Sequence, residues 1–480
     1  MSKIKSSIIS GFLWTGIQTI GSKLISLVAQ LILAWLLLPE DFGKISIAFS
    51  ITSIIIVIQN FGLTDVLVSR GKMFYHIYNL AKSISSVVAF IAITLAVIFS
   101  FIVGYIYADN DITNLILIFS LSIPFNTLSV VPDSKLRIDL KFKELSIIKF
   151  TEFFISQGLI IVFVLLGYGI YSFVFGPLIS SVLRYFWLSK EANCSHRFKF
   201  TLNHYLYLFG NSIYGFFHSI FQTIIRHSDY LILALFVSQT DVGIYFMAYS
   251  LSVQAVGLLV NSLSPILFPT LMKIPKNEIE KIKIILLKVT GIYALFGMPF
   301  ALWQASIADS LISIFFNNKW TDTILLVQIL SLGIGFSVAS SLWAPALRIK
   351  SKYKTQSFYS LLSLLFFLFL IVPLSFTEGK EGLALAVSIY LIVSGPILLF
   401  FSFRYYNIRF SELFHPILKY FSLSILIFGT CYFFTHQFNL NDMIKLLING
   451  VISPVIYFGI LFLVDKDFCA FLKEIKIIKK

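Results

Sequence analysis

Charged side chains are scarce in this sequence: Asp, Glu, Lys and Arg together make up 12% of its 480 residues. A typical soluble domain contains about 25%. Hydrophobic residues account for 58% of the chain, and its mean hydropathy is +0.89. So little charge cannot cover a water-facing surface, which excludes a large soluble domain or a disordered tail. The composition therefore predicts an integral membrane protein.

Cysteine is also scarce, and the three cysteines form no CxxC pair or metal-ligand spacing; they are Cys194, Cys431 and Cys469. We therefore expect neither a disulfide framework nor a zinc site. The sequence contains no Walker motif, no nucleotide motif and no nucleophile–base pair. We expect no cofactor, no built-in ATPase and no enzymatic activity. The first apolar stretch lacks a small-residue cleavage site and predicts a retained helix.

Long apolar runs fill most of the chain. A bilayer core requires about 20 mostly apolar residues per helix. This template predicts an all-α integral membrane protein with about 14 transmembrane helices. The predicted spans are 9–36, 43–64, 83–107, 113–132, 147–167, 172–188, 206–237, 243–269, 285–305, 323–346, 356–376, 383–403, 420–436 and 446–464.

The basic residues predict the orientation. If the N-terminus is cytoplasmic, alternate loops on that side hold 31 of the 37 Lys and Arg residues. The opposite side holds four, which are Lys44, Lys319, Lys380 and Lys445, and Lys23 and Arg226 lie within spans. Basic residues accumulate in cytoplasmic loops of membrane proteins, so we expect both termini to be cytoplasmic. The net charge of +14 then needs no nucleic acid as a partner.

Two stretches 200 positions apart resemble each other. The segments "LILAWLLLPEDFGKISIAFS" (31–50) and "LILALFVSQTDVGIYFMAYS" (231–250) share eight of twenty residues. Each covers the predicted outer end of a long helix, a turn and the start of the next helix. A second pair, "LRIDLKFK" (136–143) and "LRIKSKYK" (347–354), has an offset of 211. The eleven additional residues are expected in the external loop 306–322.

Six predicted spans separate the copies, so both copies enter the membrane in the same direction. This indicates two parallel six-helix repeats around a central cavity, the geometry of alternating access. The expected domains are an N-lobe at 1–204, a C-lobe at 205–403, and two extra helices with a basic tail at 404–480. The "LRIxxK[F/Y]K" loops read as basic clusters that set topology, with binding of anionic lipid head groups as the alternative.

The turn residues have a structural explanation. Asp41 and Asp241 are expected just before the second helix of each lobe, where a carboxylate can cap free N–H groups. Gly43 and Gly243 are expected to permit a tight turn. We favour these structural roles over contact with a substrate.

These features resemble those of a known family. Two six-helix lobes with two extra helices, and the turn "LLLPEDFG" (36–43), look like the Wzx-type flippases for lipid-linked oligosaccharides. These belong to the multidrug/oligosaccharidyl-lipid/polysaccharide (MOP) exporter superfamily. The resemblance implies a multi-pass protein of the bacterial cytoplasmic (inner) membrane. It implies a lipid-linked oligosaccharide as substrate, surrounding membrane lipid, and other polysaccharide-assembly membrane proteins as candidate partners.

Polar side chains form a stripe on the first helix of each predicted lobe. At 100° per residue they fall on one face. We predict that these faces line the cavity, although hydrogen bonding between helices within a lobe is the alternative for the amides. Lys23 has no acidic partner in its span, whereas Asp229 could neutralise Arg226. The candidate substrate-binding residues are Gln18, Lys23, Ser26, Gln30, Asn211, His218, Gln222, Arg226 and Asp229.

Two carboxylates, Asp65 and Glu152, lie near predicted cytoplasmic ends of spans, and we expect them to pair with loop lysines.

Four functions compete. A flippase needs cations for the pyrophosphate of its substrate, and Lys23 and Arg226 supply them. A multidrug exporter of the related MATE type resembles this chain in fold, but such exporters typically carry a carboxylate in the first helix, and span 1 has no Asp or Glu. A membrane polymerase or ligase would need a catalytic constellation. A structural scaffold leaves the lysine within span 1 unexplained. We therefore favour the flippase, with the exporter as the alternative.

The topology can be tested by cysteine labelling of intact cells in a background without native cysteines. Lys319→Cys and Lys380→Cys should react with a membrane-impermeant thiol reagent, because their loops are predicted to be external. Lys141→Cys and Lys352→Cys should be protected. Labelling of the last two variants would contradict the assignment.

Overall fold

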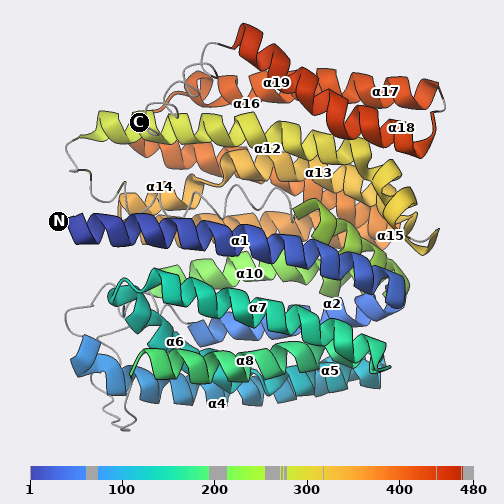
Figure 1. Cartoon of the computed structure of the whole chain (residues 1–480). Helices are drawn as coiled ribbons and strands as arrows, with labels where there is room; N and C mark the ends of the chain where they lie inside the picture. Colours follow the sequence, from blue (N-terminus) through green and yellow to red (C-terminus); the bar gives the residue numbers. More distant parts are fainter. Residues whose placement is uncertain are drawn as a thin grey trace. The chain divides into compact units, whose positions relative to one another are not determined.

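Helices form all the regular secondary structure among the described residues of the computed structural model (Figure 1). The structure describes residues 2–60, 67, 74–193, 213–253, 271, 274, 278–316, 318–438, 440–465 and 468, without the side chains of 2–13, 58–60 and 75–77. The all-α class expected from the apolar runs is confirmed for this part of the chain.

The chain divides into two compact units. Unit 1 comprises Met1–Met247 and Ser351–Leu383, and unit 2 comprises Ala248–Lys350 and Ala384–Lys480. Unit 1 therefore contains one helix and parts of two others that lie beyond the predicted N-lobe. The two units are defined by contacts between residues, whereas the two lobes are defined by the sequence repeat. The lobes therefore remain a prediction.

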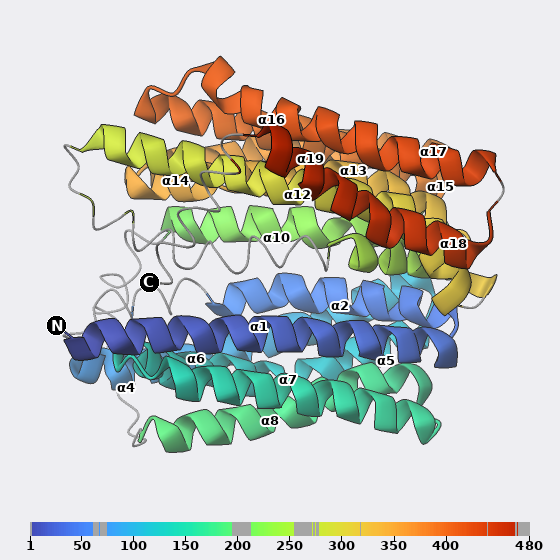
Figure 2. The same ribbon diagram turned by 45° about the horizontal axis from the view of Figure 1, so that its top comes forward.

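In unit 1 the first helix packs along α7, which also packs on α8, and α4 packs on α5 and α6 (Figures 1 and 2). The helix α10 packs against α2. Residues 239–253 form a further helix after α10. The bounds are α1 Ser2–Leu36, α2 Pro39–Asn60, α4 Phe74–Tyr107, α5 Asn110–Ser120, α6 Ile123–Ile138, α7 Phe142–Leu165, η2 Gly169–Tyr171, α8 Ser172–Glu191 and α10 Ile213–Leu233.

In unit 2 the long α12 packs on α13, α16 and α18. The two last helical rods each contain a π-helical turn, η5 and η6. The bounds are α12 Ile279–Phe315, η3 Asn318–Trp320, α13 Thr323–Ser340, α14 Trp343–Ile349, η4 Arg404–Tyr406, α16 Phe410–Ser424, η5 Ile425–Gly429, α17 Thr430–Gln437, α18 Asp442–Leu447, η6 Ile448–Ile452 and α19 Ser453–Val464. The α15 helix, Tyr353–Phe403, contributes to both units and is interrupted at Gly379, where φ is 57°.

Polar contacts bind the C-terminal rods to α12. The indole N–H of Trp303 donates to the carbonyl of Gly450, inside η6, at 3.1 Å. The amide of Asn449 donates to Thr435 Oγ1 and to the carbonyl of Ser306. A π-helical turn displaces backbone carbonyls from the regular ladder, which explains how one of them accepts from a neighbouring helix. The two extra helices are thus an integral part of unit 2.

Nine helices among the described residues are long and apolar enough to cross a membrane. They include Tyr353–Tyr406, which spans 54 residues and covers two predicted spans. The polar α10 is not among the nine, so the number fourteen stays a prediction. The predicted external loop 306–322 is wrong for most of its length, because α12 continues to Phe315 and η3 follows. Apolar residues at 311–316 extend the helix beyond the boundary expected from hydropathy.

The two "LRI" segments adopt the same local structure. In the first, α6 ends at Ile138, Leu140 has a φ of 57°, and α7 begins at Phe142. In the second, 211 positions later, α14 ends at Ile349, Ser351 has a φ of 56°, and α15 begins at Tyr353. The similar sequences therefore encode one kind of helix–helix corner at both places, which supports the predicted repeat.

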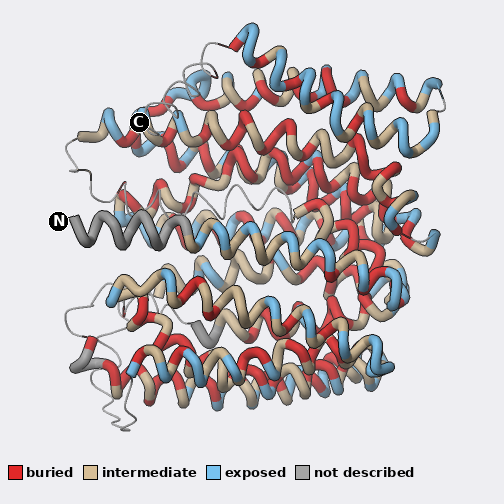
Figure 3. Tube along the Cα trace, in the orientation of Figure 1, coloured by how far each residue is buried: buried red, intermediate tan, exposed pale blue. Residues whose placement is uncertain are grey.

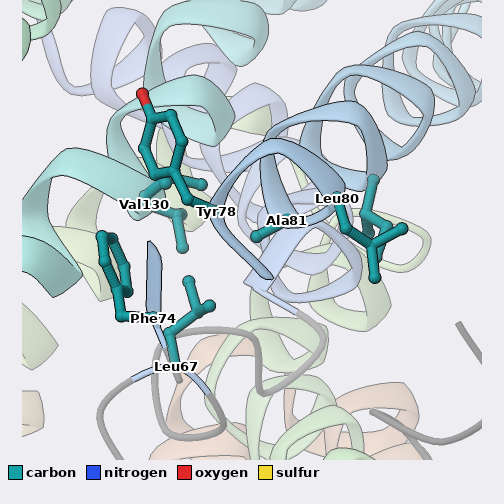
Figure 4. Close-up of a cluster of buried hydrophobic side chains, with 8 residues drawn as sticks. Leu67, Phe74, Tyr78, Leu80, Ala81 and Val130 are labelled. Carbon is teal, nitrogen blue, oxygen red and sulfur yellow. The ribbon is translucent and has the colours of Figure 1, made fainter. Parts of the chain in front are cut away.

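Buried residues concentrate along the helix faces that meet other helices (Figure 3). One buried cluster joins the start of α4 to α6 (Figure 4). It includes Phe74, Tyr78 and Ala81 from α4, Val130 from α6, and Leu67. In contrast, the outward faces carry large exposed apolar side chains such as those of α1 and α15, as expected of helices that meet lipid.

An ion-pair network joins α6, α7 and α8 inside unit 1. Asp133 lies 3.1 Å from Lys149 and also pairs with Arg137. Glu152 lies 2.9 Å from Arg184, whose other amino group donates to Asn126 at 2.7 Å. The expected pairing of Glu152 with a loop lysine is therefore wrong, because α8 extends to Glu191 and places Arg184 within the helix. Asp65 lies outside the described residues.

Removing one carboxylate from this network tests its contribution to stability. Glu152→Ala should leave Arg184 half-paired in a largely buried position and lower the free energy of unfolding by about 2 kcal/mol. The matched control is Glu144→Ala, in the first turn of the same helix, which should change it little. Thermal unfolding in detergent measures both, and equal stability of the two variants would contradict a stabilising network.

Candidate functional site

The stripe on α1 contains a lysine without a partner. Lys23 is half-buried, and no hydrogen bond or ion pair joins it to another described residue. Gln18 and Ser26, one turn away on either side, are also half-buried. An unpaired ammonium group within an apolar helix costs several kcal/mol unless water or an anion reaches it. Lys23 therefore marks a place where an anionic group would be stabilised.

The stripe ends at Gln30, close to the next helix of the second repeat. Its side-chain amide lies 2.8 Å from the sulfur of Met247. This contact joins α1 to the helix 239–253 within unit 1. The first helix of one predicted lobe thus touches the second helix of the other.

The stripe on α10 is divided between paired and open side chains. Nδ1 of His218 lies 2.6 Å from Ser360 Oγ, on α15. Arg226 is exposed, and its Nε lies 3.4 Å from the carbonyl of Gln222, which is half-buried. Asn211, the first residue of this stripe, lies outside the described residues. Arg226 is therefore the most open cation of α10 within the described part of the chain.

Asp229 does not neutralise Arg226 as we had considered. Its carboxylate, 1% exposed, accepts one hydrogen bond from Tyr245 Oη at 3.0 Å and one from the backbone N–H of Tyr230. No ion pair among the described residues joins it to Arg226. Three positions along a helix place the two residues on neighbouring faces, but here one turns inward and the other outward. Asp229 is a buried group with hydrogen-bond partners inside the protein.

Tyr245 was missed by the sequence analysis. Residues 229 and 245 each lie eight positions from residue 237, which is in the turn between the two helices. Positions at equal distances from a turn lie at the same depth in a helical hairpin. This symmetry could have pointed to the pair. In the first copy the equivalent positions hold Ala29 and Ile45, both buried, so this carboxylate–phenol pair belongs to one copy only.

The capping role predicted for the turn aspartates is visible for Asp41, whereas at the second turn Ser238 caps the backbone N–H and Asp241 binds the serine hydroxyl. Asp41 accepts from the backbone N–H of Leu38 at 2.8 Å. Asp241 accepts from Ser238 Oγ at 2.8 Å, and Ser238 Oγ accepts from the N–H of Asp241. In both copies the contact joins the residue before the helix to the third helical residue, as in a capping box. Lys380 also pairs with Asp241, at 2.8 Å.

The turn role predicted for the two glycines is wrong. Gly43 lies inside α2, and Gly243 lies inside the helix 239–253. A methyl group built on Gly43 would overlap the carbonyl oxygen of Gln239 and lie 2.8 Å from its carbon. Glycine is required here because another backbone approaches closely, and not for backbone conformation.

A hydrogen-bond hub lies beside these turns. Asp109, between α4 and α5, accepts from the Gln239 amide at 2.9 Å, and Lys44 Nζ lies 3.3 Å away. Burial favours a raised pKa for Asp109, but the hydrogen bonds from Gln239 and the Asp111 N–H, with the charge of Lys44, lower its pKa below the ordinary value. The carboxylate is therefore ionised, and its bond from Gln239 is charge-assisted.

The same end of unit 1 carries one further link between distant segments. Tyr107 Oη, at the end of α4, donates to the carbonyl of Leu231 in α10 at 2.7 Å. Together with the hub it ties α4 and its following turn to α10 and its following turn.

Residues 32–325 match the family of polysaccharide biosynthesis proteins. The capsular polysaccharide biosynthesis protein CapF of Staphylococcus aureus is 26% identical over 400 residues, which cover 79% of this chain and 96% of that protein. The succinoglycan biosynthesis transport protein ExoT of Rhizobium meliloti (strain 1021) is 22% identical, covering 70% and 68%. The lipopolysaccharide biosynthesis protein WzxC of Escherichia coli (strain K12) is 22% identical, covering 80% and 78%.

Solved structures show the same fold. The lipid II flippase MurJ, in an inward closed conformation, superposes with a TM-score of 0.72 at 20% identity, covering 94% of this chain and 99% of that one. An inward-facing MATE-family multidrug resistance transporter of the MOP superfamily superposes with a TM-score of 0.62 at 12% identity, covering 80% and 94%.

The long apolar helices define a multi-pass membrane protein, and its fold is shared with MurJ and a MATE-family transporter. Since the family match covers more than half of the chain, this protein belongs to the family of polysaccharide biosynthesis proteins. The resemblance to Wzx-type flippases is thereby confirmed.

The buried pair of Asp229 and Tyr245 can be tested by a double-mutant cycle. Tyr245→Phe should lower the thermal stability in detergent, because a buried carboxylate loses one of its two donors. Asp229→Asn should partly restore stability in the Tyr245→Phe background, since a neutral amide tolerates that loss better. Additive effects of the two substitutions would show that the side chains do not interact.

Proposed function

We propose that this protein is an alternating-access flippase that moves an undecaprenyl-pyrophosphate-linked oligosaccharide from the cytoplasmic to the outer leaflet of the bacterial inner membrane. The oligosaccharide would be the repeat unit of an O-antigen, a capsule or an exopolysaccharide. Membership in the family of polysaccharide biosynthesis proteins and the names of CapF, ExoT and WzxC support this proposal. The fold shared with MurJ supports it at the level of architecture.

The observation that carries the proposal is Lys23 within α1, which pairs with none of the described residues. A pyrophosphate diester carries negative charge, which must cross the membrane with the glycan. Lys23 lies in an apolar helix without an anionic partner, and Arg226 is exposed on the repeat-related α10. These two cations would bind the pyrophosphate, and Gln18, Ser26 and Gln222 would supply hydrogen bonds to it or to the first sugar.

The remaining predicted residues have smaller roles in this proposal. Gln30, His218 and Asp229 have partners within the protein, which are Met247, Ser360 and Tyr245. They would orient helices beside the substrate path rather than bind the pyrophosphate. Other polysaccharide-assembly membrane proteins are the proposed partners, because they supply and consume the substrate.

A MATE-like exporter of organic cations is the second candidate. The superposition with a MATE-family transporter favours it only at the level of fold. The sequence of α1 carries no carboxylate, and its one charged group beyond the first turns is Lys23, which would repel a cation. The flippase therefore fits the charge of α1 better.

The sign of the substrate can be tested by removing the two cations. Lys23→Ala and Arg226→Ala should each lower surface polysaccharide at least tenfold, with lipid-linked oligosaccharide accumulating in the inner leaflet. Lys23→Arg should retain part of the activity, because the charge remains. Surface polysaccharide and the lipid-linked pool are measured in cells that depend on this protein for export.

The matched control is Lys281→Ala, which removes an exposed lysine paired with Glu278 at the start of α12. It should export normally. Immunoblots of membrane fractions confirm equal amounts of each variant. Normal export by the double variant Lys23→Ala, Arg226→Ala would reject a cationic binding site, and drug sensitivity of the Lys23→Ala strain without a polysaccharide defect would favour the exporter.

A further inference from the structure

The two glycines of the repeated turns contact each other's copies reciprocally. A methyl group on Gly43 would collide with the carbonyl group of Gln239. A methyl group on Gly243 would collide with the carbonyl group of Pro39, lying 2.7 Å from its carbon and 2.9 Å from the nitrogen of Gly43. Gln239 and Pro39 are themselves equivalent at the 200-residue offset. We call these two approaches the reciprocal glycine contact.

This arrangement has the form of a two-fold interface. In such an interface one patch of surface meets its own equivalent, so that residue i contacts j and j contacts i. Here the two patches belong to one chain, and both lie in unit 1. Small residues at helix contacts in membranes let backbones approach more closely than side chains would permit. The absence of a side chain at both repeated glycines therefore allows the backbones of the two copies to approach closely.

Further contacts cross between the same two copies. The Gln239 amide donates to Asp109, and Tyr107 Oη donates to the Leu231 carbonyl. The ring of Phe42 lies 6.2 Å from that of Phe246. By contrast, the contacts of Asp41 and Asp241 stay within one copy. The repeated aspartates shape each turn, and the repeated glycines join the two turns.

We propose that the reciprocal glycine contact is the seal that closes the external side of the transporter and that it separates when the substrate leaves. This inference rests on the proposed function and on the predicted orientation, in which these turns are external. The closest approach in this seal depends on the absence of a side chain at Gly43 and at Gly243. Its few hydrogen bonds, of which one is charge-assisted, allow the turns to part and rejoin.

An added methyl group on either glycine should hold the turns apart. A carbon at van der Waals contact lies about 3.5 Å or more from another carbon, so the backbones must retreat by roughly 1 Å at each site. Gly43→Ala and Gly243→Ala should thus shift the protein toward the externally open state. Both substitutions favour a helix locally, because alanine is the better helix former, so a loss of closure is not explained by a weaker helix.

Spin labels at two exposed, repeat-related positions measure the separation of the turns. Glu40→Cys and Thr240→Cys are labelled with nitroxides in a background without native cysteines, and pulsed electron resonance gives the distance distribution in nanodiscs. The parent should show a predominant short-distance population. Gly43→Ala and Gly243→Ala should move most of it to longer distances.

The matched control is Gly158→Ala in α7, where a methyl group would meet no atom within 4 Å. It should leave the distribution unchanged. An unchanged distribution in the folded Gly43→Ala and Gly243→Ala variants would overturn the proposal, as would a parent without a short-distance population.

A milder variant covers the case in which the glycine variants do not fold. Gln239→Ala removes the hydrogen bond to Asp109 and leaves both glycines in place, so it should broaden the distribution toward longer distances. No change would overturn the proposal. The spin-label distances are measured without substrate. A failure of the proposed flippase activity in transport assays can therefore be told apart from a failure of the proposed seal.

Discussion

Every polar group within a membrane-spanning helix needs a partner inside the protein, because the hydrocarbon core offers none. Several such groups in the described part of the chain have one. Asn449 binds two neighbouring helices, Trp303 reaches a carbonyl in a π-helical turn, and Glu152 pairs with Arg184. These contacts determine which helices pack together, including the two C-terminal rods of unit 2. The apolar surface alone would permit many other pairings.

The same constraint makes the exception informative. Lys23 is half-buried and has no hydrogen bond or ion pair with any residue that the structure describes, whereas the carboxylate of Asp229 is fully buried and receives two hydrogen bonds. Both residues belong to polar stripes of similar appearance. Their surroundings differ: the protein supplies hydrogen-bond donors to Asp229, whereas Lys23 needs water or an anion. A substrate that carries pyrophosphate supplies the missing charge, which connects the physical cost of Lys23 to the proposed transport.

The aspartate and the glycine that recur at both turns have different structural roles. The aspartates hold the first turns of their own helices through contacts with residues 38 and 238. The glycines instead create room for the backbone of the opposite copy. The proposed alternating-access mechanism requires the two predicted lobes to come together and separate repeatedly. A contact between backbones can do this with little rearrangement of side chains. The nearby hydrogen bond from Gln239 to Asp109 fixes how the two turns are oriented when they meet.

Composition and periodicity determined the membrane class, the long helices and the polar faces of α1 and α10, because these depend on neighbouring residues. They also indicated the capping role of Asp41 and the two matching "LRI" corners. The extent of α12 and the partner of Glu152 were missed, since helix ends and ion pairs depend on residues from other helices. The tertiary structure alone revealed why Gly43 and Gly243 are glycines. Local sequence cannot show this, because the atoms that exclude a side chain at each glycine lie about two hundred residues away in the chain.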